Sequence, residues 1–165
     1  MGPSRKSRIG AVELGRFGVE AWAKIRANGL WEPVEQLIAG NAGGLQQMAP
    51  VEQGILDLFC IALRFKSKTY GEDAIRALVD SYYDALKMPE QERAYWEGVI
   101  NYRFSEYHES FRSFPSGIEL PNKAAAYIAT DPTLEVVLAV KAHILAILMS
   151  WSDTLQEIEN EYEIT

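Results

Sequence analysis

A short segment in the second half of this 165-residue chain holds most of the side chains that could do chemistry. Arg103, Glu106, His108, Glu109 and Arg112 are spaced so that neighbours three or four residues apart can touch along one helix. Histidine can transfer a proton near neutral pH, and arginine can stabilise the charge of a phosphate. The same residues can instead form a solvated ladder of ion pairs, each contributing about 0.2–0.5 kcal/mol. The segment therefore suits either a reaction centre or a charged binding surface.

The spacing of Arg103 and His108 resembles the Arg-x4-His signature of HEPN ribonucleases. The resemblance covers six residues, and Phe104 stands where that family usually has a polar residue. It implies an all-helical, dimeric domain in which the arginine and histidine of two chains line a shared cleft and support attack by the RNA 2′-hydroxyl. A HEPN-like, metal-independent ribonuclease that uses Arg103 and His108 is therefore our alternative prediction.

Other kinds of reaction centre lack the residues they need. The chain has two histidines and one cysteine, and it contains neither a His-Glu-x-x-His nor a Gly-x-Ser-x-Gly motif. Cys60 lies in an apolar run where an inert core thiol is expected, and we interpret His143 as a core histidine with satisfied hydrogen bonds. We predict no metal, no cofactor and no favoured catalytic residue, and hence a protein that is not an enzyme.

The charge of the chain favours a protein partner over a nucleic acid. The formal net charge is −7, whereas proteins that bind phosphates need a positive contact face. Arg5, Lys6 and Arg8 open the chain, and five acidic residues crowd its other end. An acidic surface attracts a basic partner, although charged ends are also commonly only solvated.

We therefore predict a non-catalytic protein-binding module, of the inhibitor, antitoxin or immunity type, that recognises a basic protein face through an acidic helical surface. Such a protein uses shape, charge and aromatic anchors. Homodimerisation is compatible with this prediction, and a structural subunit of a larger assembly is a third interpretation. The predicted contact residues are Arg103, Glu106, Glu109, Arg112, Trp151, Leu155, Glu157, Ile158, Glu159, Glu161 and Tyr162.

Apolar residues recur three or four apart along most of the chain, which is the pattern of helices that face a core. No alternating pattern indicates a strand. The fourth and fifth predicted helices should form a hairpin, because Pro89 forces a break between them. We predict an all-α, single-domain bundle of about six to seven helices around a long C-terminal helix, with residues 1–8 a flexible basic N-terminus and residues 9–165 the domain. The predicted helices span 9–27, 30–38, 50–63, 71–86, 90–111, 121–129 and 131–162.

The last predicted helix is the most apolar. Asp131 should cap it and Pro132 should begin it. Its first half is apolar nearly all round and should be buried, whereas its acidic second half should project or pair. The segment 134–149 is shorter than a bilayer span of about 20 residues and carries charge. With no apolar signal-peptide core after the basic start, we expect a cytoplasmic protein without a membrane partner.

Overall fold

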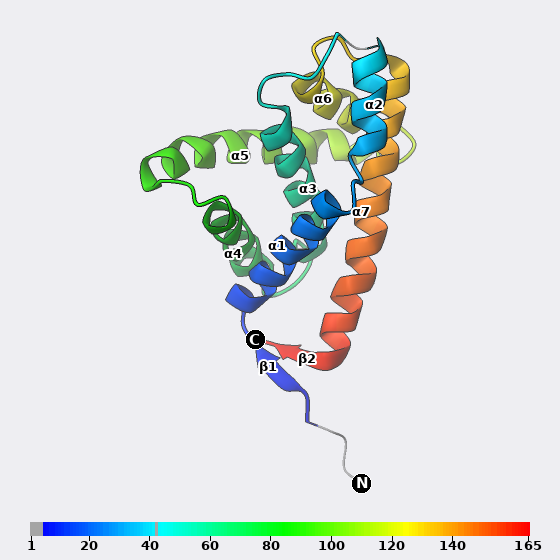
Figure 1. The fold of residues 1–165 in the computed structure, drawn as a ribbon. Helices are drawn as coiled ribbons and strands as arrows, with labels where there is room; N and C mark the ends of the chain where they lie inside the picture. Colours follow the sequence, from blue (N-terminus) through cyan, green and yellow to red (C-terminus); the bar gives the residue numbers. More distant parts are fainter. Residues whose placement is uncertain (1–4, 42) are drawn as a thin grey trace.

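The computed structural model of the chain describes residues 5–41 and 43–165. Within these residues the chain forms seven α-helices, one short 3-10 helix and two short strands, which confirms the predicted all-α bundle with a long C-terminal helix (Figure 1). The elements are β1 Ser7–Ile9, α1 Ala11–Ala27, α2 Glu32–Asn41, α3 Ala49–Phe65, α4 Gly71–Ala85, α5 Glu90–Ser110, η1 Phe111–Ser113, α6 Glu119–Ile128, α7 Leu134–Glu161 and β2 Tyr162–Ile164.

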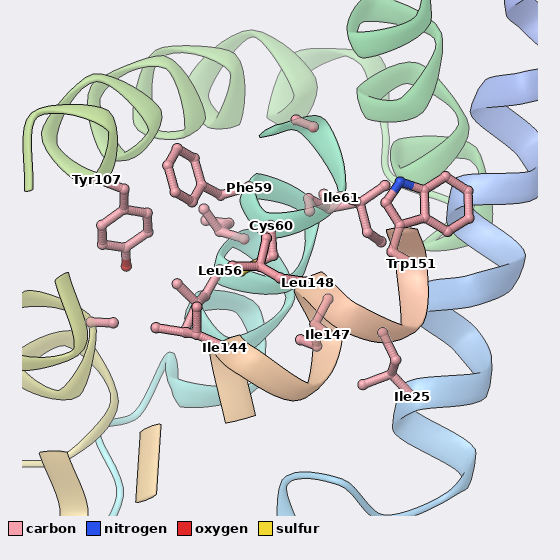
Figure 2. Packing of buried hydrophobic residues seen from close by; sticks show 14 of the residues in the cluster. Ile25, Leu56, Phe59, Cys60, Ile61, Tyr107, Ile144, Ile147, Leu148 and Trp151 are labelled. Carbon is pink, nitrogen blue, oxygen red and sulfur yellow. The ribbon is translucent and has the colours of Figure 1, made fainter. Parts of the chain in front are cut away.

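Helix α3 lies at the centre of the bundle. Every residue from 52 to 62 is buried, and α1, α4, α5, α6 and α7 all pack against this helix. Figure 2 shows Phe59 and Ile61 of α3 among side chains of α7 and α5, with Trp151 at one end of the cluster and Tyr107 at the other. Burial raises the pKa of the Cys60 thiol well above its usual value, so this cysteine is an unreactive core residue.

Helices α1 and α4 approach each other closely because α1 presents glycine where they cross. A Cβ atom on Gly15 would lie 2.6 Å from the carbonyl carbon of Ala77, and one on Gly18 would lie 2.6 Å from a methyl group of Leu78. At Gly15 the neighbour is backbone, so only hydrogen fits there, whereas at Gly18 the Leu78 side chain would have to move. Helix α4 therefore packs closely on α1, and it also packs on α3.

Helices α4 and α5 do not form the predicted hairpin. Both pack on α3, but α4 packs further on α1 and α5 packs further on α6. The turn that joins them contains Lys87, whose φ is 51°, and the extended Pro89 then starts α5 in a new direction. The two helices diverge from this turn (Figure 1), and the space between them is lined by side chains of α3, α4 and α5.

Helix α7 begins two residues later than expected. Thr133 is the N-cap residue, and its hydroxyl accepts a hydrogen bond of 3.3 Å from the backbone N–H of Val136. Asp131 and Pro132 belong to the connection from α6, so the prediction that they cap and begin the helix is wrong. Threonine and aspartate both cap helices, and their order in the sequence does not decide between them.

The two ends of the described chain pair with each other, a feature that the sequence pattern did not predict. β1 and β2 form a parallel two-stranded sheet in which Arg8 lies opposite Glu163, and their side chains form an ion pair of 2.9 Å. Lys6 donates a hydrogen bond of 2.6 Å to the carbonyl of Glu159. Regular structure therefore starts at Ser7, within the predicted flexible segment 1–8, of which residues 1–4 lie outside the described residues. Three-residue strands are too short to show alternation.

Candidate functional site

Arg103 is held inside the bundle by an ion pair with Glu52. Its Nε and Nη2 atoms donate to the two carboxylate oxygens of Glu52 at 3.0 and 2.9 Å, and its guanidinium lies 3.5 Å from the centre of the Tyr127 ring. The hydroxyl of Tyr127 donates to Glu106 at 2.7 Å. Burial lowers the pKa of Arg103, but the hydrogen bond and charge of Glu52 outweigh it and raise the pKa overall. This cluster joins α5 to α3 and α6.

His108 points toward the opposite end of α3. It is exposed, and its Nε2 atom contacts Nζ of Lys66, which follows the last residue of α3. Glu52 and Lys66 are separated by about 21 Å along the helix axis, at 1.5 Å per residue. Arg103 and His108 lie five residues apart on α5, about 7.5 Å along its axis, but their side chains have different partners, near opposite ends of α3. A ribonuclease of the HEPN type needs both side chains in one cleft, and the donors of Arg103 that face Glu52 are already used.

Three predicted contact residues on α7 are not on the surface. Trp151, Leu155 and Ile158 are all buried, and the Trp151 ring packs edge-on against Phe65 with 5.8 Å between centroids. In this structure these three predicted contact residues are therefore part of the core and not of an exposed surface. The second half of the helix does not project, because its apolar side is covered by α1, α3 and the segment that follows α3.

The remaining predicted contact residues lie in several places. Glu159 accepts from Lys68 at 2.7 Å and from Tyr70 at 3.0 Å, and the hydrogen bond from Lys68 lowers its pKa. Tyr162 packs on Phe17, with 6.3 Å between ring centroids. The exposed members of the predicted set are Glu109, Arg112, Glu157 and Glu161.

The outer face of α7 is apolar, which sequence reasoning missed because it expected the first half of the helix to be buried all round. Leu134, Leu138 and Met149 are 62%, 48% and 67% exposed, Ala142 is exposed and Leu145 is half-buried. Their spacings of four, four, three and four residues align them on one side of the helix. We call these five residues the outer stripe; it is about 22 Å long at 1.5 Å per residue.

Helix α7 as a whole is long and apolar enough to cross a membrane by length and composition, a criterion that the core helix of a globular bundle also meets. Its inward face supplies core residues such as Val140, Ile144 and Ile147. Its outward face adds the outer stripe. The stripe residues fall on the side of the helix opposite the fully buried positions, a division that the nearly uniform apolar sequence of this segment does not mark.

A buried polar network also lies against α7. His143 Nε2 is 2.8 Å from Asp57, its Nδ1 is 3.3 Å from the carbonyl oxygen of Leu30, and Trp31 donates to the same carboxylate at 3.0 Å. Desolvation by burial raises the pKa of Asp57 even though the hydrogen bond from His143 opposes it. His143 is thus a core histidine with partners on both ring nitrogens, as predicted.

Neither a metal cluster nor a known relative assigns chemistry to these residues. Over residues 5–41 and 43–165, no three histidine, cysteine, aspartate or glutamate side chains lie close enough together to hold a metal ion. Comparisons with protein-family models, with curated proteins and with solved structures found no match to this chain. What the protein does has to be inferred from its own surfaces.

Proposed function

We propose that this protein is a non-catalytic binding domain, of the inhibitor, antitoxin or immunity type, that recognises another protein chiefly through the outer face of α7. The observation that carries this proposal is the outer stripe. Single exposed apolar residues are normal on protein surfaces, but a contiguous apolar row with a polar border is typical of an interaction site.

The shape of the outer stripe suits a helix of a partner. Ala142 lies in its middle, between larger side chains at Leu138 and Met149, so a second helix can approach closely at the centre while its own side chains fill the flanks. Fully burying one leucine or methionine side chain stabilises a complex by about 1.5–3 kcal/mol. These side chains are already partly buried, so covering the stripe contributes a fraction of this amount per residue to the free energy of binding.

The charges beside the stripe favour a partner with basic residues. Exposed acidic side chains flank the stripe at both ends, Glu135 near its start and Asp153 beyond its end, and the exposed Glu157 follows one turn later. Lys141, half-buried at the border, is the only lysine or arginine in α7. Opposite charges steer encounter and set orientation. We therefore propose an amphipathic helix with basic flanks as the occupant, in keeping with the predicted basic partner.

The proposal is tested with a double variant, Leu138→Glu with Met149→Glu, beside Val12→Glu as a control. Val12 is 56% exposed on α1, so the control places the same charge on another helix. Each protein is immobilised, partners are captured from the source cells and identified by mass spectrometry, and the purified partner is titrated against all three. We expect one stoichiometric protein that binds wild type and control equally and binds the double variant at least about tenfold more weakly.

Two outcomes would contradict the proposal. One is a partner that binds the double variant as tightly as the wild type, and the other is turnover of a substrate by the purified protein. If the captured protein is a second copy of this chain, sedimentation of the wild type as a dimer and of the double variant as a monomer would replace the external partner with a homodimer. Circular dichroism of all three proteins checks that the substitutions leave the fold intact.

A further inference from the structure

A cavity of about 520 Å³ lies where α3, α4 and α5 meet. None of its lining residues belongs to the outer stripe of α7. Its volume falls within the range of small-molecule sites, roughly 300–1,000 Å³. Phe59 of α3 and Phe104 of α5 form part of its wall, packed edge to face with 5.6 Å between ring centroids. Ala62, Leu63 and Ile75 complete the apolar lining.

The cavity exists because α4 and α5 diverge instead of packing as a hairpin. It continues into a more polar cleft of about 660 Å³ between the same two helices, with Ile75 and Phe104 lining both spaces. The walls stand on helices that are each fixed elsewhere: α4 by the close contact with α1, and α5 by the ion pair of Arg103 with Glu52. The cavity is therefore preformed, which reduces the entropy lost when a ligand binds.

The rim of this cavity carries two lysines, of which one is paired with an acid. Lys66 Nζ lies within hydrogen-bond distance of His108, and in the described part of the chain Lys66 forms no ion pair with an acid. Lys68, also on the rim, is already paired with Glu159 at 2.7 Å. Glu72 is the acidic member of the rim, and it also lines the neighbouring cleft, so it marks the border between the two spaces.

We infer that this cavity binds a small carboxylic acid with an apolar body. The carboxylate would lie against Lys66 and His108, where a cation and a ring N–H can donate to it, and the body would lie against Phe59 and Phe104. Among the residues that the structure describes, Lys66 is the one cation of this rim without an acidic partner, so it matches one negative charge, and Glu72 disfavours a ligand with several. An unbranched acid of medium length fits the volume. This inference does not depend on the contact surface of α7.

The probe is decanoate, titrated into the full-length protein by calorimetry below the concentration at which it forms micelles, with 1-decanol as the uncharged counterpart. Two variants disturb the site in different ways: Lys66→Glu reverses the charge at the rim, and Ala62→Phe fills the apolar interior. Lys123→Glu, which changes an exposed lysine on α6, is the matched control. Thermal melting shows which variants remain folded, and Lys66→Glu, on an exposed side chain, keeps the test valid if Ala62→Phe unfolds.

We expect saturable binding of one decanoate, weakened at least about tenfold by Lys66→Glu, which corresponds to the loss of one charge-assisted hydrogen bond. Ala62→Phe should also abolish binding in a folded protein, Lys123→Glu should leave it unchanged, and 1-decanol should bind more weakly than decanoate. The inference is overturned if decanoate does not saturate, if Lys66→Glu and Lys123→Glu act alike, or if acid and alcohol bind equally.

Discussion

Arg103 and Glu52 lie 51 positions apart in the chain and form a two-bonded ion pair that joins α5 to the first turn of α3. The side-chain exposures are only 16% for Arg103 and 7% for Glu52. Arg103, which we predicted from the sequence as a catalytic or partner-binding residue, thus links α5 to α3. The net stabilisation by a buried ion pair is small because both charges are desolvated, but removal of one partner leaves an uncompensated charge and is costly.

Replacement of Arg103 by alanine should destabilise the fold. The substitution leaves the Glu52 carboxylate buried without its partner, and breaking one side of a buried ion pair costs about 3–5 kcal/mol. Arg112→Ala, on an exposed arginine of the same region, should change the free energy of unfolding by less than about 0.5 kcal/mol. Urea denaturation of both variants measures the difference. Equal stabilities would show that the ion pair contributes nothing.

Glycine at two helix positions should respond to alanine in opposite directions. Gly15→Ala places a methyl group 2.6 Å from the backbone of α4, so the helices must separate, at a cost of about 1–3 kcal/mol. Gly98 lies in α5 with open space around it, and Gly98→Ala should stabilise the helix by about 0.5–1 kcal/mol. Thermal melts should therefore shift down for the first variant and up for the second. An unchanged or raised melting temperature for Gly15→Ala would contradict the packing described for α1 and α4.

Glu159 should make stability depend on pH in the acid range. The hydrogen bond from Lys68 lowers its pKa below 4.5, so the ionised carboxylate is favoured more in the folded than in the unfolded chain. Its contribution is present above the unfolded pKa and is lost as pH falls through the folded pKa. The Glu159→Gln variant should thus have a lower free energy of unfolding than wild type at pH 7. This difference in free energy should become smaller toward pH 3. Urea denaturation of both proteins at the two pH values measures this difference. The same difference at both pH values would contradict a stabilising ion pair between Lys68 and Glu159.

The ribonuclease alternative makes its own prediction. If Arg103 and His108 cleaved RNA, single-stranded RNA would be hydrolysed without a divalent metal, and His108→Ala would stop hydrolysis in a folded protein. The geometry of the chain leads us to expect no hydrolysis above that of His108→Ala. RNA cleavage is followed by gel electrophoresis in the presence of a chelator. Cleavage by wild type alone would replace the proposed binding function with catalysis.

Spacing of apolar residues was enough to predict the helices and the long α7, because each helix faces one core and the 3.6-residue period records that face. Spacing did not predict which helices pack against each other, because that depends on several helices at once. The predicted hairpin of α4 and α5 does not form because α4 packs closely on α1 at Gly15 and Gly18. Glycine has no apolar side chain, so these two positions do not contribute to the periodic pattern. The pairing of Arg8 with Glu163 depends on bringing the two chain ends together, which no local pattern encodes.

The candidate sites were harder to predict than the fold. The exposure of Leu138 and Met149 depends on which face of an almost uniformly apolar helix meets α3, and composition does not distinguish the faces. Trp151 has the same residue type and spacing as an interface anchor but is enclosed by the core. The cavity beside Lys66 arises from the divergence of two helices, so no single segment of sequence contains it.

The most direct test of the proposed function is a cross-link from the outer stripe. Cys60 is the only cysteine and is buried, so Leu138→Cys introduces a single reactive thiol to which a photoactivatable cross-linker can be attached. Val12→Cys places the same group on α1. In source-cell extract, irradiation should join another protein to position 138 and not to position 12. Absence of any cross-linked protein at position 138, or the same products at both positions, would contradict a binding function for the outer face of α7.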